Sequence, residues 1–191
     1  NIEILKQDVV VEGDYDLSGK IVDLNGHTLS VQGNLYCGDT YLKTSGGSIC
    51  VKSDVVISDK TQIQGKMQAD GNLTISGSYL EFVHAQIMVG GNLIVSEDGY
   101  NYGISLMHED DELRICGDMD YRALYQMGNQ AGGIFVAGDV DISGVFEQGS
   151  CAVFCMNGTE TQNINVTGNV KFGTFQAKNT SINGIVSNDI F

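Results

Sequence analysis

Four aspartates hold matching places in two neighbouring stretches of the chain. Asp118 and Asp120 stand two residues apart, and Asp139 and Asp141 repeat that spacing in the following stretch. If the two stretches are stacked strands, the four carboxylates point outward from one face at strand spacing. Such carboxylates repel one another unless something neutralises them, and calcium accepts several oxygen ligands in loose geometry. The sequence therefore predicts a candidate calcium site at these residues.

Ordinary ion pairing is the alternative to calcium. Arg114 and Arg122 flank the first pair of aspartates, and Lys171 is expected one repeat above the second pair. The chain also lacks a D-x-[DN]-x-[DN]-G loop and a nonapeptide calcium repeat. An Asp or Asn recurs at the place of Asp118 in every repeat, which favours a structural role. There a short side chain can bond its own backbone or stack on its neighbour.

A second acidic group follows His108 and lies just before an expected strand. Acids in a turn usually face solvent, but an acidic and aromatic insertion is expected nearby at 97–103. We therefore predict a binding surface made of Tyr100, Tyr102, Glu109, Asp110, Asp111 and Glu112. The three histidines, His27, His84 and His108, fall in different repeats, and no two of them have the spacing of metal ligands.

These candidates are carried by a short pattern that recurs along nearly the whole chain. Apolar residues stand at −4, −2, +2 and +4 around a zero position, and Asp or Asn stands at +1. The zero positions are Gly13, Gly33, Ser53, Gly71, Gly91, Gly117, Gly138, Gly168 and Asn188. The alternation predicts strands with one buried face, and a period near 20 residues predicts a solenoid whose stacked repeats share a core.

The predicted fold is all-β: a right-handed parallel β-helix, or β-solenoid, with about eight to nine coils of ~20 residues. Each coil has two short strands that meet at a corner glycine, which points inward and lets the chain bend. A weaker third segment follows, as at 21–24 and 79–82. A left-handed hexapeptide coil would repeat every ~18 residues, which fits one interval only.

Two intervals are longer than the rest. About six extra residues are expected near 97–103 and about ten within 146–161, both as surface loops. The ninth pattern, 184–191, stops partway through its second strand, so residues 1–191 are expected to be one domain within a longer protein. An uncapped end strand favours pairing with another chain, which makes end-to-end or edge self-association an expectation.

Composition narrows the classes of partner. The net charge is −14, from 24 acidic against 10 basic residues, so nucleic acid would be repelled. No apolar run approaches the length of a membrane span, so membrane insertion is not expected. The five cysteines include no C-x-x-C pair and indicate neither a disulfide framework nor a zinc site. Cys37, at an inward position, is expected to be buried.

Catalytic signals in the sequence are weak. Glycoside hydrolysis requires two carboxylates about 5 to 9.5 Å apart in a cleft. In a solenoid many pairs meet that distance, Asp120 and Asp141 among them, so the distance discriminates poorly. Tryptophan is absent, and the aromatic platforms available for a sugar are Tyr36, Tyr79, Tyr100, Tyr102 and Tyr125. There is no nucleophile elbow or phosphate loop, so no catalytic residue is assigned.

The patterns at 33–35, 71–75 and 138–142 resemble the parallel β-helix repeats of large bacterial surface proteins. The resemblance covers nearly the whole chain and is structural in kind. It implies a non-enzymatic module, secreted or at the cell surface, for adhesion, ligand display or spacing, with a glycan or a protein as ligand. The alternative is a polysaccharide-processing enzyme of the β-helix type, a lyase or a glycoside hydrolase.

Overall fold

The computed structural model describes residues 2–126, 128–184 and 187–188, and this part of the chain forms strands and turns without any helix. The largest sheet holds β1 (Ile2–Ile4), β2 (Val9–Val11), β4 (Ile21–Asp23), β5 (Thr28–Val31), β7 (Thr40–Val51), β9 (Thr61–Ala69), β11 (Tyr79–Val89), β13 (Gly103–Leu106), β14 (Glu112–Ile115), β16 (Gly128–Asn129), β17 (Gly133–Val136), β20 (Val153–Met156) and β23 (Thr174–Ala177).

Two further sheets complete the coils. The second sheet holds β3 (Tyr15–Asp16), β6 (Leu35–Cys37), β8 (Val55–Ile57), β10 (Leu73–Ile75), β12 (Leu93–Val95), β15 (Met119–Tyr121), β18 (Val140–Ile142), β21 (Gln162–Val166) and β24 (Thr180–Gly184). The third sheet holds β19 (Val145–Glu147), β22 (Asn169–Phe172) and β25 (Ser187–Asn188).

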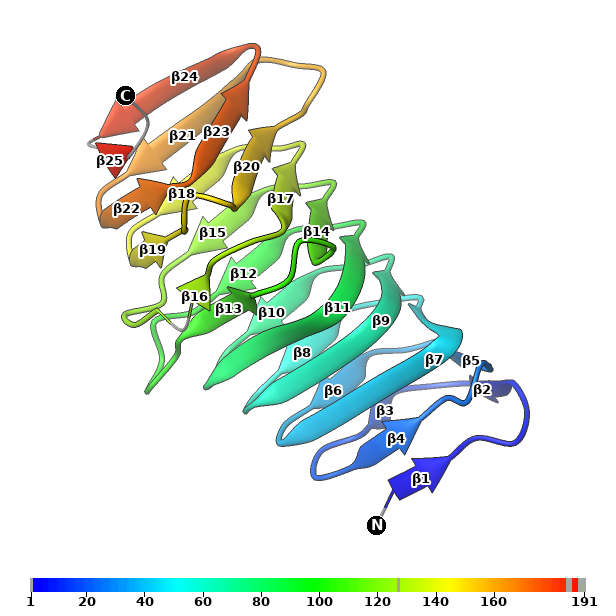
Figure 1. The fold of residues 1–191 in the computed structure, drawn as a ribbon. Helices are drawn as coiled ribbons and strands as arrows, with labels where there is room; N and C mark the ends of the chain where they lie inside the picture. Colours follow the sequence, from blue (N-terminus) through cyan, green and yellow to red (C-terminus); the bar gives the residue numbers. More distant parts are fainter. Residues whose placement is uncertain (1, 127, 185–186, 189–191) are drawn as a thin grey trace.

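Neighbouring coils pair in parallel and in register. Val55, Leu73 and Leu93 are successive partners in β8, β10 and β12. In Figure 1 the long near strands β7, β9 and β11 run up to the right while the stack climbs to the upper left, and the second sheet returns behind them. This is the right-handed sense, and the stack has about nine turns. The protein is a β-solenoid, as the sequence predicted.

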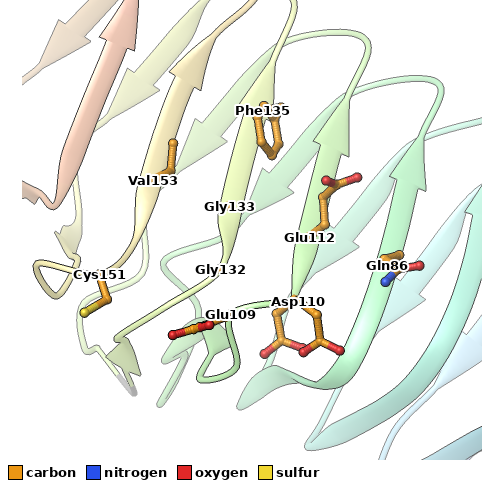
Figure 2. A pocket seen from close by; sticks show the side chains of 10 residues that line it. Gln86, Glu109, Asp110, Glu112, Gly132, Gly133, Phe135, Cys151 and Val153 are labelled. Atoms are coloured by element: carbon orange, nitrogen blue, oxygen red, sulfur yellow. The ribbon is translucent and has the colours of Figure 1, made fainter.

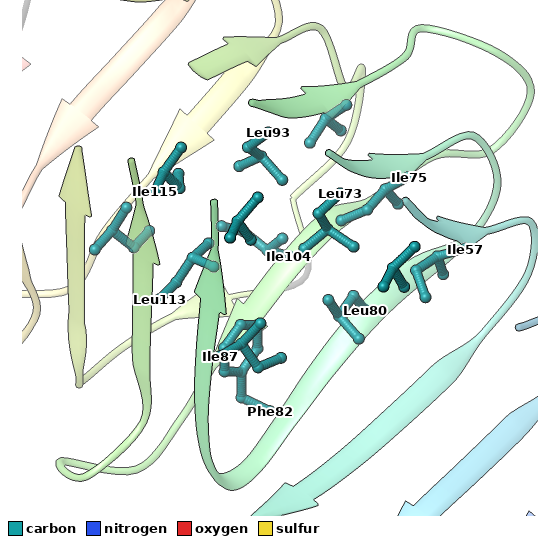
Figure 3. Packing of buried hydrophobic residues seen from close by; sticks show 14 of the residues in the cluster. Ile57, Leu73, Ile75, Leu80, Phe82, Ile87, Leu93, Ile104, Leu113 and Ile115 are labelled. Carbon is teal, nitrogen blue, oxygen red and sulfur yellow. The ribbon is translucent and has the colours of Figure 1, made fainter. Parts of the chain in front are cut away.

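The core lies inside the coil and is built from the inward positions of the pattern. Leu73, Leu93 and Leu113 are fully buried, and Figure 3 shows these side chains packed between the sheets. Cys37 is fully buried too, as predicted, and burial raises the pKa of its thiol to about 12. No helix among the described residues is long and apolar enough to cross a membrane.

The corner glycines are needed for a reason that the sequence did not reveal. A Cβ on Gly117 would lie 2.1 Å from Oδ1 of Asn92, one coil below, and one on Gly138 would lie 2.2 Å from Oδ1 of Asp118. The chain bends at these glycines, as predicted, but both are half-exposed, so the predicted inward placement is wrong. At Gly117 and Gly138 a side chain of the coil below occupies the place of a Cβ, whereas Ser53 holds the equivalent corner above Asn34.

That side chain belongs to a ladder that links the coils. Oδ1 of Asp14, Asn34, Asp54, Asn72, Asn92, Asp118 and Asp139 each accepts the backbone N–H of the equivalent residue one coil above, over distances of 2.7 to 3.1 Å. The sequence predicted a structural role at these positions, and this is confirmed. The partner is the backbone of the next coil, whereas bonding to its own backbone or side-chain stacking was expected.

Gly168 lies at a bend between two strands, as predicted, but this is a different corner of the coil from the one at the other zero positions. Ile164 and Val166 pair with β18 and so belong to the second sheet, while 169–172 form β22 of the third sheet. Asn163 continues the ladder in place of the expected Asn169, since its N–H donates to Asp139. β21 and β22 show the same alternation, so the pattern did not say which sheet each of them joins. The ninth pattern, 184–191, lies largely outside the described residues.

The stretch 146–161, in which ten extra loop residues were expected, is not one loop, because β19 and β20 interrupt it. Val136 and Val140 pair with Met156 and Ile164, so this corner is only four residues longer than the one below. Gln162 lies at this corner, directly before the ladder residue Asn163. Its Nε2 donates to the carbonyls of Val136 at 3.0 Å and Gly138 at 2.5 Å.

The insertion expected near 97–103 is confirmed, although it is divided. Ile75 and Tyr79 are partnered by Val95 and Gly103, which leaves four extra residues in that loop. Two more lie in the turn before β14, where Glu81 and Gln86 are partnered by Ser105 and Glu112.

Candidate functional site

The four aspartates proposed for calcium do lie together, on the outer face of β15 and β18. Asp120 and Asp141 are register partners, and the residues around them line a shallow groove of about 320 Å³. Asp118 and Asp139 each give Oδ1 to the ladder. These two carboxylates are thus already committed to the backbone of the next coil.

The other two aspartates have side-chain partners. Arg122 donates from Nε to Asp120 at 2.8 Å and pairs with it again through its terminal nitrogen at 2.5 Å. This contact with Asp120 raises the pKa of Arg122. Asp141 accepts a bond of 3.3 Å from Nδ2 of Asn165. Ordinary ion pairing, the alternative to calcium, therefore accounts for Asp120.

The other basic residues named for this role lie elsewhere. Arg114 pairs with Glu112, and Lys171 is the register partner of Glu147 in the third sheet. Among the described residues no group of three or more His, Cys, Asp or Glu is arranged to hold a metal ion.

Asp111 has a different environment from the rest of the acidic run. Its side chain is fully buried, and Oδ1 accepts the N–H of Ala85 at 2.9 Å. Oδ2 accepts the N–H groups of Met107 at 3.0 Å and His108 at 2.9 Å, and contacts Nδ1 of His108 at 3.1 Å. Asp111 thus satisfies the backbone of the turn and of a bulge in β11, which makes it structural and removes it from the predicted binding surface.

That bulge creates the need for Asp111. The register of β11 against β9 shifts between Val83 and Ala85, and His84 between them has a φ of 51°. The N–H of Ala85 therefore turns to Asp111 of the next coil. An unpaired buried N–H would cost about 1 to 3 kcal/mol, so an acceptor at this place is needed.

His84 and His108 meet above this bulge, although they are scattered in the sequence. Their rings lie 3.9 Å apart between centroids. Nδ1 of His84 is 2.8 Å from Oδ1 of Asp110, and because a carboxylate only accepts, His84 is the donor. This bond lowers the pKa of Asp110. Two side chains, Asp111 and Asp110, therefore hold the turn against β11.

A hollow of about 610 Å³ lies beside this turn (Figure 2). Its floor is open because Gly133 has no side chain, and a Cβ there would lie 2.6 Å from the ring of Phe135. Arg114 lies over that ring, 4.3 Å from its centroid. Arg114 also bonds both oxygens of Glu112 at 2.6 and 3.0 Å, which raises the pKa of Arg114. Glu109, Asp110 and Glu112 line the hollow, as Figure 2 shows.

Tyr100 and Tyr102 belong to a second surface, which we call the tyrosine corner and which consists of Tyr100, Tyr102 and Tyr125. The ring of Tyr125 lies 6.0 Å from that of Tyr100 and 5.2 Å from that of Tyr102, between centroids. Tyr100 is 75% exposed and Tyr125 is 43% exposed. The corner joins loops of two successive coils, which follow β12 and β15.

Buried contacts hold both loops of the tyrosine corner. Asn101 is fully buried, and its Nδ2 donates to the carbonyls of Ile75 and Ser96, each at 2.9 Å. Its Oδ1 accepts the N–H of Gly103 at 2.8 Å. In the other loop Ala123 is buried and accepts the N–H of Val145 at 2.7 Å. The tyrosines are therefore carried on loops with fixed ends.

The sequence grouped these residues incompletely. Tyr125 was one of five tyrosines named as possible platforms for a sugar. It lies beside Tyr100 because an insertion lengthens the coil between them. The His84–His108 contact depends on the same insertion, because the two residues are 24 positions apart instead of about 20. Allowing for extra residues in the coil between them would have suggested both pairs.

No family model, no curated protein and no solved structure matches the chain. The site must be judged by its own geometry.

Proposed function

We propose that this chain is a non-enzymatic display module, whose coil holds a binding surface for a protein or glycan ligand. The observation that carries the proposal is the tyrosine corner. Two loops from successive coils bring three aromatic rings together at the surface, and one ring is 75% exposed. Aromatic side chains with few rotatable bonds supply contact area at low entropic cost, which suits a recognition surface.

The coil beneath the corner supports this role. Its loops are fastened by Asn101 and Ala123, so little ordering is needed when a ligand binds. We further propose that the module works outside the cell, at a bacterial surface or after secretion, in line with the repeats that its sequence resembles. Adhesion and the spacing of other domains are both compatible with a rigid coil.

Processing of polysaccharides is the competing function. Asp120 and Asp141 are register partners on an open face, as a pair of catalytic carboxylates would have to be. Against this, both carboxylate oxygens of Asp120 accept hydrogen bonds from Arg122, so neither is free to contact a sugar as a catalytic acid or base would have to.

One experiment separates the two functions. The protein is incubated with a panel of neutral and acidic polysaccharides, and released sugar and bound ligand are both measured. We expect no release of sugar from any polymer. Release that is abolished by Asp120→Asn or Asp141→Asn would overturn the display function and establish the enzyme. The variant Asp16→Asn, in β3 at the far end of the stack, is the control for a general loss of charge.

A further inference from the structure

The large apolar side chains exposed among the described residues form two groups, while Tyr36, Met88, Met107 and Ile182 are scattered over other strands and turns. One group, Ile2, Ile4, Val10 and Ile21, lies in the first coils. Another lies at the tyrosine corner, where Leu124 is 53% exposed between Arg122 and Tyr125. An exposed apolar and aromatic patch on loops that buried hydrogen bonds hold in place is often an interaction site.

The charges beside this patch decide what kind of partner fits it. Glu97 and Asp98 are exposed in the loop that carries Tyr100. The cation at the corner, Arg122, is already bound to Asp120, and the charges of Glu97 and Asp141 also reach it. The whole chain carries a net charge of −14. A cationic ligand is therefore attracted to the corner, while an anionic one is repelled.

We infer that the tyrosine corner binds a lysine- or arginine-bearing peptide segment of a partner protein. The inference rests on the proposed display function and names its ligand. A cation over a tyrosine ring within about 6 Å is attracted by the negative face of the ring. The exposed ring of Tyr100 offers such a face, and the carboxylates of Glu97 and Asp98 stand in the same loop. Leu124 adds apolar contact for the stem of a long basic side chain.

The first test uses a synthetic decapeptide of alternating lysine and alanine. Its counterparts are an arginine–alanine decapeptide, a glutamate–alanine decapeptide, and cellohexaose as a neutral glycan. Binding is measured by titration calorimetry and by tyrosine fluorescence, which the absence of tryptophan makes readable. We expect both basic peptides to bind and their affinity to fall as salt is raised. The acidic peptide and cellohexaose are expected not to bind.

Variants then locate the contact. Tyr100→Ala and Tyr125→Ala should each weaken the basic peptides about two- to fivefold, and the double variant about tenfold or more. Tyr36→Ala is the matched control, because Tyr36 is also exposed but lies in β6, at the other end of the stack. Tyr100 and Tyr125 are exposed, so melting temperatures should stay within a degree or two of the wild type.

Each other outcome overturns the inference in a recognisable way. If Tyr36→Ala weakens binding as much as Tyr100→Ala, the peptides bind the negative charge of the whole chain and not the corner. If cellohexaose binds and the basic peptides do not, the ligand class is wrong while the display function stands. If none of the probes binds, the corner is not a peptide site. Release of sugar in the preceding experiment refutes the display function itself.

Discussion

The ladder and the acidic turn use the same side chain in opposite ways. In the ladder each Asp or Asn lies half-exposed or exposed and accepts the N–H of the equivalent residue in the next coil. In the turn the buried carboxylate of Asp111 accepts three N–H groups from two different segments. In the ladder each side chain accepts one backbone N–H, whereas in the turn a single carboxylate accepts three.

The difference teaches how a solenoid tolerates interruption. A regular coil needs only a weak bond at each step, because every neighbour repeats it. The bulge at His84 and the two extra residues of the turn break the repetition, so backbone groups there have no equivalent partner. A single buried acceptor, Asp111, therefore takes the place of several ladder hydrogen bonds.

The largest effect is expected from Asp111→Ala. The change leaves the buried N–H of Ala85 and the partly buried N–H groups of Met107 and His108 without their acceptor, so we expect the free energy of unfolding to fall by about 3 kcal/mol. Urea unfolding measures it. Asp98→Ala, an exposed acid in the nearby loop, is the control and should stay within about 0.5 kcal/mol of the wild type. Equal effects would mean that Asp111 has no special role.

Gly117→Ala should come next. Its Cβ would lie 2.1 Å from Oδ1 of Asn92 and 2.8 Å from the carbonyl oxygen of Gly91, and we expect a loss of about 1 to 3 kcal/mol. Gly13→Ala is the matched control, because nothing lies within 4 Å of a Cβ at the equivalent corner of the first coil. Adding Asn92→Gly should restore part of the stability by removing the nearest obstacle, and a double-mutant cycle measures this coupling. A strictly additive pair would refute the steric role of the ladder.

A single rung should matter less. Asn72→Ala removes the acceptor for the N–H of Asn92, which is 2.8 Å away and partly buried. We expect a loss of about 1 kcal/mol in the free energy of unfolding, because a half-exposed N–H can turn to water. If this loss equals that of Asp111→Ala, one ladder residue stabilises the fold as much as Asp111 does, and the contrast between the ladder and the turn is wrong.

The smallest effect on stability is expected at low pH. The bond from His84 lowers the pKa of Asp110 below its ordinary value of 3.8, so the ionised form favours the folded state. Its contribution is complete above pH 3.8 and is lost as the pH falls through the lowered pKa. We therefore expect Asp110→Asn to show a shallower fall of stability in that range. Carbon NMR of the side-chain carboxyl in the wild type measures the pKa directly, and an unshifted value would contradict the bond.

The candidate site was predictable in part. The sequence placed Asp118, Asp120, Asp139 and Asp141 on one outer face, and the structure confirms that neighbourhood. It grouped Asp111 with a solvent-facing run, although the residue is buried. A strand pattern reports which side of the chain is apolar, but a turn has no such period. The partners of Asp111 come from another coil, so local sequence carried no sign of them.

The sequence by itself determined the class of fold, because period-two alternation repeated about every 20 residues has few ways to bury its apolar side. It also determined where the chain departs from that period, near 97–103. The tertiary structure decided which sheet each strand joins, since β21 and β22 share one alternation and the bend at Gly168 was therefore assigned to the wrong pair of sheets. It decided, too, that Tyr100 meets Tyr125 and His84 meets His108. Such contacts between coils depend on register, which is set when the coils stack and bury a common core.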